Sequence, residues 1–200
     1  MFVVTMDQRG SRSHGDKVPQ LLAELEGVAT VLPFERSVGD EVQAVLDDPR
    51  AVVEAAMRAL RTREWYVGIG VGDVDLPLPA SPREASGAAF IAAREAVESA
   101  KKLGGRVPLR VAAGAGGVEW AGAAESVLVL VGDLVRSRSA AEWAVLDAMD
   151  AMPGAAQKDV ARQLDISPQA VSRAILRSGR PEEFNGRQAA VLLLEQALRA

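Results

Sequence analysis

The sequence predicts an α+β domain followed by an all-α region. In the first part of the chain, short apolar runs typical of strands alternate with amphipathic segments at helical spacing. From Val118 onward this alternation ends, and helical spacing with helix-capping residues dominates. We therefore divide the chain into an α+β domain at 1–117, a connecting helix at 118–138 and a helical domain at 139–200.

The composition excludes several classes of protein. The chain has 200 residues, of which 48% are hydrophobic and 25% charged, as in ordinary globular proteins. It has no cysteine and a single histidine, His14, so disulfides, thiolate catalysis and sites built from several histidines are excluded. A net charge of -4 argues against binding nucleic acid through bulk charge, but a local basic face remains open. No leader-like segment or membrane-length apolar run is present, so we expect a cytoplasmic protein without a membrane partner.

The α+β domain is predicted to begin with a strand, Met1–Met6, which ends at Asp7. A polar loop follows, and a helix is expected to start near Pro19 and to stop at Gly27. The next apolar segment, Ala29–Phe34, is the second predicted strand.

A tight turn at Gly39 and Asp40 joins this strand to a third one. Gly39 supplies the backbone freedom that the turn needs. After the turn, Val42, Ala44 and Leu46 alternate with other residues, which is typical of a strand with a buried face. The carboxylate of Asp40 at the tip of the turn can bind a metal ion, but turns also favour Asp for local hydrogen bonds, and both interpretations remain open.

The second half of this domain repeats the pattern of helix and strand. The elements expected here are a helix at Pro49–Arg63, a strand at 65–74, an alanine-rich helix at 88–102 and a strand at 107–112. Asp48 followed by Pro49 is a favourable start for the first of these helices. Near its C-terminal end, Arg58, Arg61 and Arg63 are interpreted as a solvated face.

The region after Val118 is predicted to be helical. The apolar run within Glu119–Val135 fits either a strand or a helix, and we favour a helix that packs on the first domain or on a second subunit. A second helix is expected at Ala140–Met152. The final helix, Glu183–Arg199, could support the fold or join two subunits. Its inward residues are expected to be Ala190, Val191, Leu194 and Leu198.

Residues 157–176 have the pattern of two short helices joined by a tight turn. Ala161 is small where the two helices would cross, and Asp165 occupies a turn position that is often Gly. Asp tolerates the left-handed backbone conformation better than most residues. Ser167 and Pro168 are suited to cap and start the second helix. The segment thus resembles a helix-turn-helix.

The second helix of this pair is the candidate DNA-binding element. No acidic residue lies between Pro168 and Pro181. The candidate DNA-binding residues are Gln169, Ser172, Arg173 and Arg177 on the outward face of this helix, and Arg180, which follows it. Arg and Gln can pair with base edges in the major groove, and Ser and Arg can contact phosphates. The alternative is a helical packing unit that does not bind DNA. Helix-turn-helix proteins commonly bind double-stranded DNA as homodimers, so we expect a homodimer.

A family resemblance joins these parts. The order of strands and helices, with Asp7 at the first strand end and the motif Gly39–Gln43 (Gly-Asp-Glu-Val-Gln), resembles the palm domain of class III nucleotide cyclases and GGDEF-type diguanylate cyclases. Together with the C-terminal helix-turn-helix, the chain resembles the SatD family of bacterial proteins more closely. This resemblance implies a ferredoxin-like palm with an antiparallel sheet, followed by an all-α DNA-binding domain.

The resemblance also implies a nucleotide site. Asp7 and Asp40 match the metal-binding acids of the cyclases, and Arg94 matches an arginine of their catalytic helix. Mg²⁺ with a nucleotide is the implied cofactor. Departures occur where Phe90 replaces an Asn and Val38 replaces a glycine.

Arg36 stands where the cyclases use a lysine to read the base. From the helix-turn-helix, and from a cyclase-like domain that departs from the catalytic pattern, we expect a DNA-binding transcription regulator. Its cyclase-like domain would dimerise and sense a nucleotide without catalysis. The alternatives are an active nucleotidyl cyclase or related two-metal phosphoryl-transfer enzyme, and a structural interaction protein.

Overall fold

The protein is an α+β molecule built on one sheet. The computed structural model describes residues 1–200 except for the side chains of Arg12 and His14, so the sequence's single histidine lies outside the described side chains. The strands are β1 (Phe2–Gln8), β2 (Leu32–Arg36), β3 (Glu41–Leu46), β4 (Trp65–Val71) and β5 (Leu109–Ala113). All five predicted strands are therefore present, with ends that differ by a few residues.

The strand order is β2-β3-β1-β4-β5. The first four strands pair in antiparallel fashion, but β5 runs parallel to β4. The prediction of a wholly antiparallel sheet was wrong, because the chain between β4 and β5 makes a helical crossover, and such a crossover joins parallel strands. The sheet is mixed.

Helices account for most of the rest of the chain. They are α1 (Ser11–His14), α2 (Val18–Glu24), α3 (Pro49–Thr62), α4 (Ala88–Ala100), α5 (Val118–Ser137), α6 (Ala140–Ala151), α7 (Gln157–Gln163), α8 (Pro168–Arg177) and α9 (Arg180–Arg199). Two short 3-10 helices lie at Pro82–Glu84 and Lys101–Leu103. The residues of α1 were predicted to lie in a loop. The ambiguous apolar run after Val118 is a helix, as favoured. No helix in the part of the chain that the structure describes is long and apolar enough to cross a membrane.

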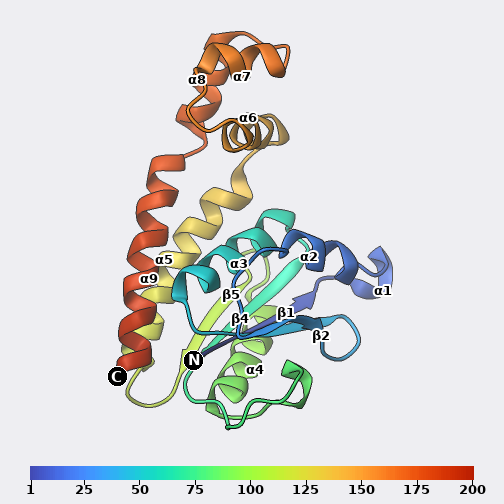
Figure 1. Cartoon of the computed structure of the whole chain (residues 1–200), viewed down its shortest axis with the longest axis vertical. Helices are drawn as coiled ribbons and strands as arrows, with labels where there is room; N and C mark the ends of the chain where they lie inside the picture. The colour runs from blue at the N-terminus through green and yellow to red at the C-terminus, as the bar shows by residue number, and fades with distance from the viewer.

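The two faces of the sheet carry different helices. α2, α3, α5 and α9 share one hydrophobic core with one face of the sheet, whereas α4 covers the other (Figure 1). Two glycines of β4 let α4 lie very close to the sheet. A Cβ atom at Gly70 would lie 2.0 Å from the carbonyl oxygen of Ala89, and one at Gly68 would lie 2.4 Å from the amide nitrogen of Val97. Any larger residue would push α4 away from β4.

The C-terminal helices divide between two packing units. α6, α7 and α8 surround a small core of Val145, Ala148, Val160, Ala161, Val171 and Ala174, and we call these three helices the head. The rest of the chain, including α5 and α9, is the body. Figure 1 shows the head at one end of the molecule, above the long α5–α9 pair.

The placement of α9 corrects the boundary drawn at 139–200. Ala190, Val191, Leu194 and Ala197 are buried in the core of the body, because α9 returns along α5 to the sheet. Leu198, expected to face inward, remains 39% exposed. The helical domain is therefore confined to the head, and α9 supports the fold of the body.

Candidate functional sites: an exposed helix, an acidic cluster and an interdomain cleft

The turn between α7 and α8 has the local geometry that the sequence predicts. Asp165 adopts the left-handed conformation with a φ of 53°. The Ser167 side chain accepts a hydrogen bond from the backbone amide of Ala170, and Pro168 is the first residue of α8. Val171 and Ala174 point into the core of the head. This packing fixes which face of α8 points outward.

The outward face of α8 carries four of the five candidate DNA-binding residues. Gln169, Ser172, Arg173 and Arg177 are all exposed. Arg177 forms an ion pair with Glu142 of α6, with 3.3 Å between Nε and Oε1, but its side chain remains 70% exposed. The helix lies at the end of the molecule farthest from the sheet (Figure 1). It is therefore accessible to a large partner.

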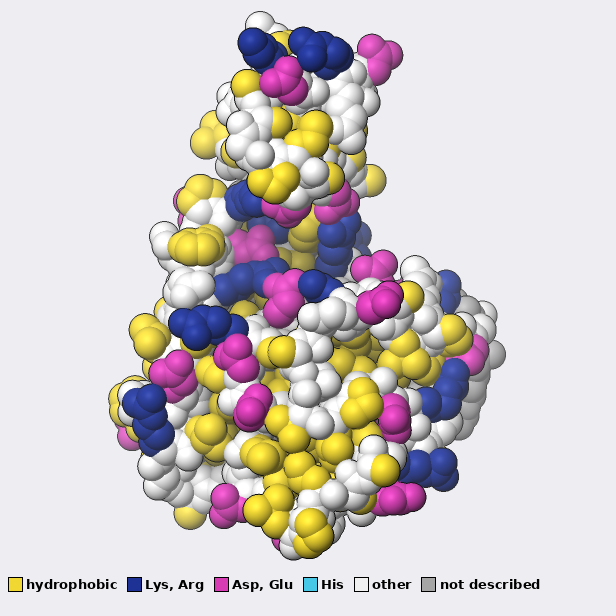
Figure 2. Space-filling model, viewed as in Figure 1, with side chains coloured by type: hydrophobic (Ala, Val, Ile, Leu, Met, Phe, Trp, Pro, Cys, Tyr) yellow, Lys and Arg dark blue, Asp and Glu magenta, His cyan; other side chains and the backbone are white. Residues whose placement is uncertain are grey.

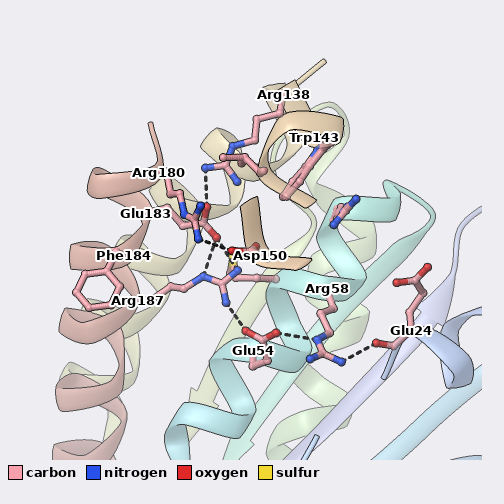
Figure 3. A pocket seen from close by; sticks show the side chains of 13 residues that line it. Glu24, Glu54, Arg58, Arg138, Trp143, Asp150, Arg180, Glu183, Phe184 and Arg187 are labelled. Atoms are coloured by element: carbon pink, nitrogen blue, oxygen red, sulfur yellow. Dashed lines mark hydrogen bonds and ion pairs between the residues drawn. The ribbon is translucent and has the colours of Figure 1, made fainter. Parts of the chain in front are cut away.

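Arg180 lies apart from the other four. It is the first residue of α9, and its guanidinium forms an ion pair with Asp150 of α6. This pair lies where the head meets the body, as Figure 3 shows. The structure therefore does not place Arg180 on the outward face of α8, because the chain reverses at Gly179, which has a φ of 60°.

Sequence reasoning missed three exposed residues of the head. Leu176 is 82% exposed on α8, and Lys158 and Arg162 are exposed on α7. Figure 2 shows Lys and Arg side chains at the tip of the head. An apolar residue at helical spacing is normally assigned to a core, so the sequence alone gave no reason to place Leu176 outside.

A second cluster of charged residues lies on the α4 side of the sheet, at the ends of β1 and β3. Asp7 and Glu41 are directly opposed in the two strands. Lys101, just after α4, places its Nζ 2.8 Å from the Asp7 carboxylate. One layer deeper, the buried Gln43 side chain donates a hydrogen bond of 2.9 Å to Thr5. This face of the sheet thus changes from apolar to charged along the strands.

Burial raises the pKa of Asp7, and the hydrogen bond and charge of Lys101 oppose that effect. The negative charges of Asp40 and Glu98 contribute further to the increase in the pKa of Asp7. Burial also raises the pKa of Glu41, against the opposing positive charge of Arg94. Of the three residues of the predicted nucleotide site, Asp7 lies in this cluster, and the charges of Asp40 and Arg94 act on the carboxyl groups of Asp7 and Glu41, respectively.

The acidic cluster fits a metal ion only in part. Among the described side chains, no group of three or more His, Asp or Glu residues is arranged to hold a metal ion. However, the Oε1 atom of Glu41 is buried without a hydrogen-bond partner among those side chains. Mg²⁺ is commonly held by one or two carboxylates together with phosphate oxygens and water. With Lys101 paired to Asp7, the described side chains offer such an ion few carboxylate ligands of their own.

Two of the residues that depart from the cyclase pattern, Phe90 and Arg36, make contacts within this chain. Phe90 packs against the small core between α4 and the sheet. Arg36 donates a hydrogen bond of 2.6 Å to the carbonyl of Gly39 and forms an ion pair with Asp16. Val38, at the tip of the hairpin, is 66% exposed.

Arg61 and Arg63 are exposed and Arg58 is partly exposed, as expected for a solvated face, but all three also bind neighbouring parts of the chain. Arg61 forms two hydrogen bonds of 2.8 and 2.6 Å with Asp147 in the head. Arg63 donates hydrogen bonds to the backbone carbonyls of Arg136 and Arg138. Arg58 donates hydrogen bonds to the Glu54 side chain and to the backbone carbonyls of Glu24, the last residue of α2, and Glu26. These arginines hold neighbouring elements together, which the sequence could not reveal because their partners lie far away along the chain.

The head and body enclose a cleft of about 470 Å³. Figure 2 shows Lys, Arg, Asp and Glu side chains gathered in a band where the head meets the body. The cleft is lined by Glu24, Glu54, Met57, Arg58, Arg61, Arg138, Trp143, Leu146, Asp150, Arg180, Glu183, Phe184 and Arg187. It was not predicted, because its walls come from four separate stretches of sequence.

In comparisons with known proteins, no family model, curated protein or solved structure matches this chain.

Proposed function

We propose that the protein is a DNA-binding transcription regulator, and that α7 and α8 form a helix-turn-helix whose second helix enters the major groove. The observation that carries the proposal is the exposed polar face of α8 at the free end of the head, with Gln169, Ser172 and Arg173 side by side. Arg and Gln side chains on such a helix can form bidentate hydrogen bonds with base edges. Lys158 and Arg162 on α7 can contact the phosphate backbone.

The proposal includes the family suggested by the sequence. The strand order β2-β3-β1-β4, with helices between β1 and β2 and between β3 and β4, supports a ferredoxin-like palm related to the cyclases and to the SatD family. In this proposal the palm is a regulatory and dimerising domain, and the protein binds double-stranded DNA as a homodimer.

The first test measures DNA binding. Genomic fragments selected by the purified protein supply a target duplex, and fluorescence anisotropy then gives the affinity across a salt titration. We expect Arg173→Ala to weaken binding roughly tenfold or more, since one bidentate base contact contributes about 1–3 kcal/mol of discrimination. If Arg173 contacts a phosphate instead, the salt slope should fall by about one.

The matched control is Arg83→Ala, which removes an exposed arginine from the body. The proposed recognition helix is contradicted if the protein selects no DNA fragment. It is also contradicted if Arg173→Ala leaves both the affinity and the salt slope unchanged.

A second candidate function concerns the acidic cluster, and the unpartnered Oε1 atom of Glu41 favours it. Asp7 and Asp40 would hold Mg²⁺ together with nucleotide phosphates, and Arg94 and Lys101 would bind the phosphates. The ion would neutralise phosphate charge and fix the nucleotide in place. Calorimetric titration with ATP or GTP and Mg²⁺ should then give binding that Asp40→Ala abolishes.

Release of pyrophosphate in the same mixtures, lost in Asp40→Ala, would instead establish the alternative of an active nucleotidyl cyclase. A dissociation constant of about 1 mM corresponds to a binding free energy of only about 4 kcal/mol. If the wild type does not bind nucleotide at that concentration, the sensing role is rejected.

A further inference from the structure

A small hollow lies beside the C-terminal end of α5, at residues that line neither the cleft nor the acidic cluster. Its volume is about 280 Å³, and it is lined by Arg63, Asp133, Arg136 and Ser137. Arg63 caps the C-terminus of α3 in the left-handed conformation, with a φ of 63°. The other three residues lie at the end of α5. The hollow therefore lies where the C-terminal ends of two helices of the body meet.

Backbone carbonyl groups hold the two arginines of the hollow in place. Nη2 of Arg63 donates hydrogen bonds to the carbonyls of Arg136 and Arg138, the second of them 3.0 Å long. Nη1 of Arg136 donates one of 3.3 Å to the carbonyl of Arg106. Among the described residues, the side-chain hydrogen bonds of Arg63 use only Nη2 and those of Arg136 use only Nη1. Both guanidinium groups therefore have nitrogen donors left for a ligand.

The hollow lies within a group of arginines that lack carboxylate partners. Arg9 belongs to this group, because its backbone amide donates a hydrogen bond of 2.7 Å to the carbonyl of Glu64, the residue after Arg63. Neither Glu64 nor Asp133 forms an ion pair among the described side chains, and the same holds for Arg9, Arg63, Arg106 and Arg136. This distinguishes the hollow from the cleft, whose arginines are paired with carboxylates.

Arg136 carries the clearest sign of uncompensated positive charge. Its Nε atom is buried without a hydrogen-bond partner among the described residues. Burial lowers the pKa of Arg136, the positive charges of Arg9 and Arg63 lower it further, and the opposing effect of Asp133 is the smallest. The end of a helix carries only about half a unit of negative charge, which is too little to neutralise several arginines. An anion in the hollow would supply the missing charge.

Phosphate is the anion whose chemistry fits this hollow. Near neutral pH a phosphate monoester carries between about 1.5 and 2 negative charges. Its oxygens accept charge-assisted hydrogen bonds from guanidinium groups, often in pairs. A volume of about 280 Å³ is just below the range of about 300–1,000 Å³ typical of sites for larger ligands. The ligand is therefore small, or enters the hollow only with its phosphate group.

We propose that this hollow binds a phosphate dianion, either inorganic phosphate or the phosphate group of a small monoester, through the available donors of Arg63 and Arg136. The bound anion would join the end of α3 to the end of α5. Arg63 also binds the carbonyl of Arg138, which lies between α5 and the first helix of the head. The anion would thus stabilise the base on which the head stands. This site does not depend on the proposed DNA binding.

The test uses the full-length protein in calorimetric titrations at low ionic strength, slightly above neutral pH. The probes are inorganic phosphate, methyl phosphate and dimethyl phosphate. Dimethyl phosphate carries a single charge and represents the phosphate of a DNA backbone. We expect saturable binding of the two dianions and much weaker binding of dimethyl phosphate. Tighter binding of inorganic phosphate would identify free phosphate as the ligand, whereas equal or tighter binding of methyl phosphate would identify a monoester.

Two variants test the residues of the hollow. Arg136→Met keeps an apolar side chain but removes the charge, and it should weaken phosphate binding roughly tenfold or more, because a charge-assisted contact is lost. Asp133→Asn removes the carboxylate that repels the anion, and because Asp133 is exposed the fold should persist. It should strengthen binding several-fold, which damage to the fold would not do. Arg83→Met, an exposed arginine outside the hollow, is the control and should bind like the wild type.

The proposal is overturned if neither dianion gives saturable binding to the wild type up to about 10 mM. It is also overturned if dimethyl phosphate binds as tightly as the dianions, if Arg136→Met binds like the wild type, or if Asp133→Asn binds no more tightly. Arg63 and Arg136 would then serve only to cap the end of α5. These titrations contain no DNA, so their outcome is independent of the anisotropy measurements.

Discussion

At the scale of single residues, the pKa of a charged side chain depends on its burial and on its charged partners. Glu54 is an example. Burial by itself would raise its pKa, but the hydrogen bond from Arg58 and the charges of Arg187 and Arg58 outweigh burial, so the net pKa is lowered. A carboxyl group with a lowered pKa in the folded state stabilises the fold when it is ionised.

We predict that Glu54→Gln lowers the free energy of unfolding by about 1 kcal/mol at neutral pH, since it weakens two partly exposed ion pairs. The difference from the wild type should be fully present above the ordinary pKa of 4.5 and should disappear as the pH falls through the lowered value. Urea denaturation between neutral and acidic pH measures this.

The exposed Glu84→Gln is the control for that experiment, and it should show no such pH dependence. A constant difference between Glu54→Gln and wild type at every pH would mean that the charge of Glu54 does not stabilise the fold.

At the scale of elements, the position of α4 depends on the glycines of β4. The sequence showed an alanine-rich helix, which indicates a close helix–sheet contact, but not which residues it meets. In the structure, Ala89 and Ala93 of α4 lie against Gly70. Their backbone atoms fill the space that a side chain would need.

We predict that Gly70→Ala lowers the free energy of unfolding by about 2 kcal/mol or more, because the new methyl group would meet helix backbone rather than a movable side chain. The matched control is Gly122→Ala on α5, where nothing lies within 4 Å of the added atom. That change should raise stability by about 0.5–1 kcal/mol through helix propensity. Denaturant midpoints measure both, and equal effects would contradict the close contact.

At the scale of the whole molecule, α5 and α9 carry six of the nine large exposed hydrophobic residues found outside the head among the described side chains. Large exposed hydrophobic residues of this pair are Val118, Trp120, Leu130, Phe184, Leu192 and Leu198. Exposed apolar surface of this kind commonly marks a protein interface. It supports the proposed homodimer, in which two heads would be available for two DNA half-sites.

We predict that Leu192→Glu shifts the protein toward monomer in sedimentation velocity, because a charge would have to be buried in the interface. Leu192 is 62% exposed in the single chain, so the change should leave the fold of the chain intact. Ile91→Glu on α4, at a position 65% exposed, is the matched control and should leave the mass unchanged. Identical sedimentation of the two variants and the wild type would argue against an interface on this pair.

Much of the local structure could be predicted from the sequence. The caps at Asp48 and Ser167 and the left-handed Asp165 were all predicted and are confirmed, because each depends on a few neighbouring residues. That Asp7, Asp40 and Arg94 form one site was inferred only from the family resemblance and stays a prediction. The partners of Arg58, Arg61, Arg63 and Arg180 were not predicted, since most of them lie on other elements and are set by how those elements pack.

The sequence by itself determined the type and approximate bounds of the elements, because apolar periodicity and capping act within a few residues. The direction of β5, the return of α9 to the body and the cleft below the head were decided only by the tertiary structure. Those features follow from which apolar faces bury one another, and residues far apart along the chain contribute to each of them.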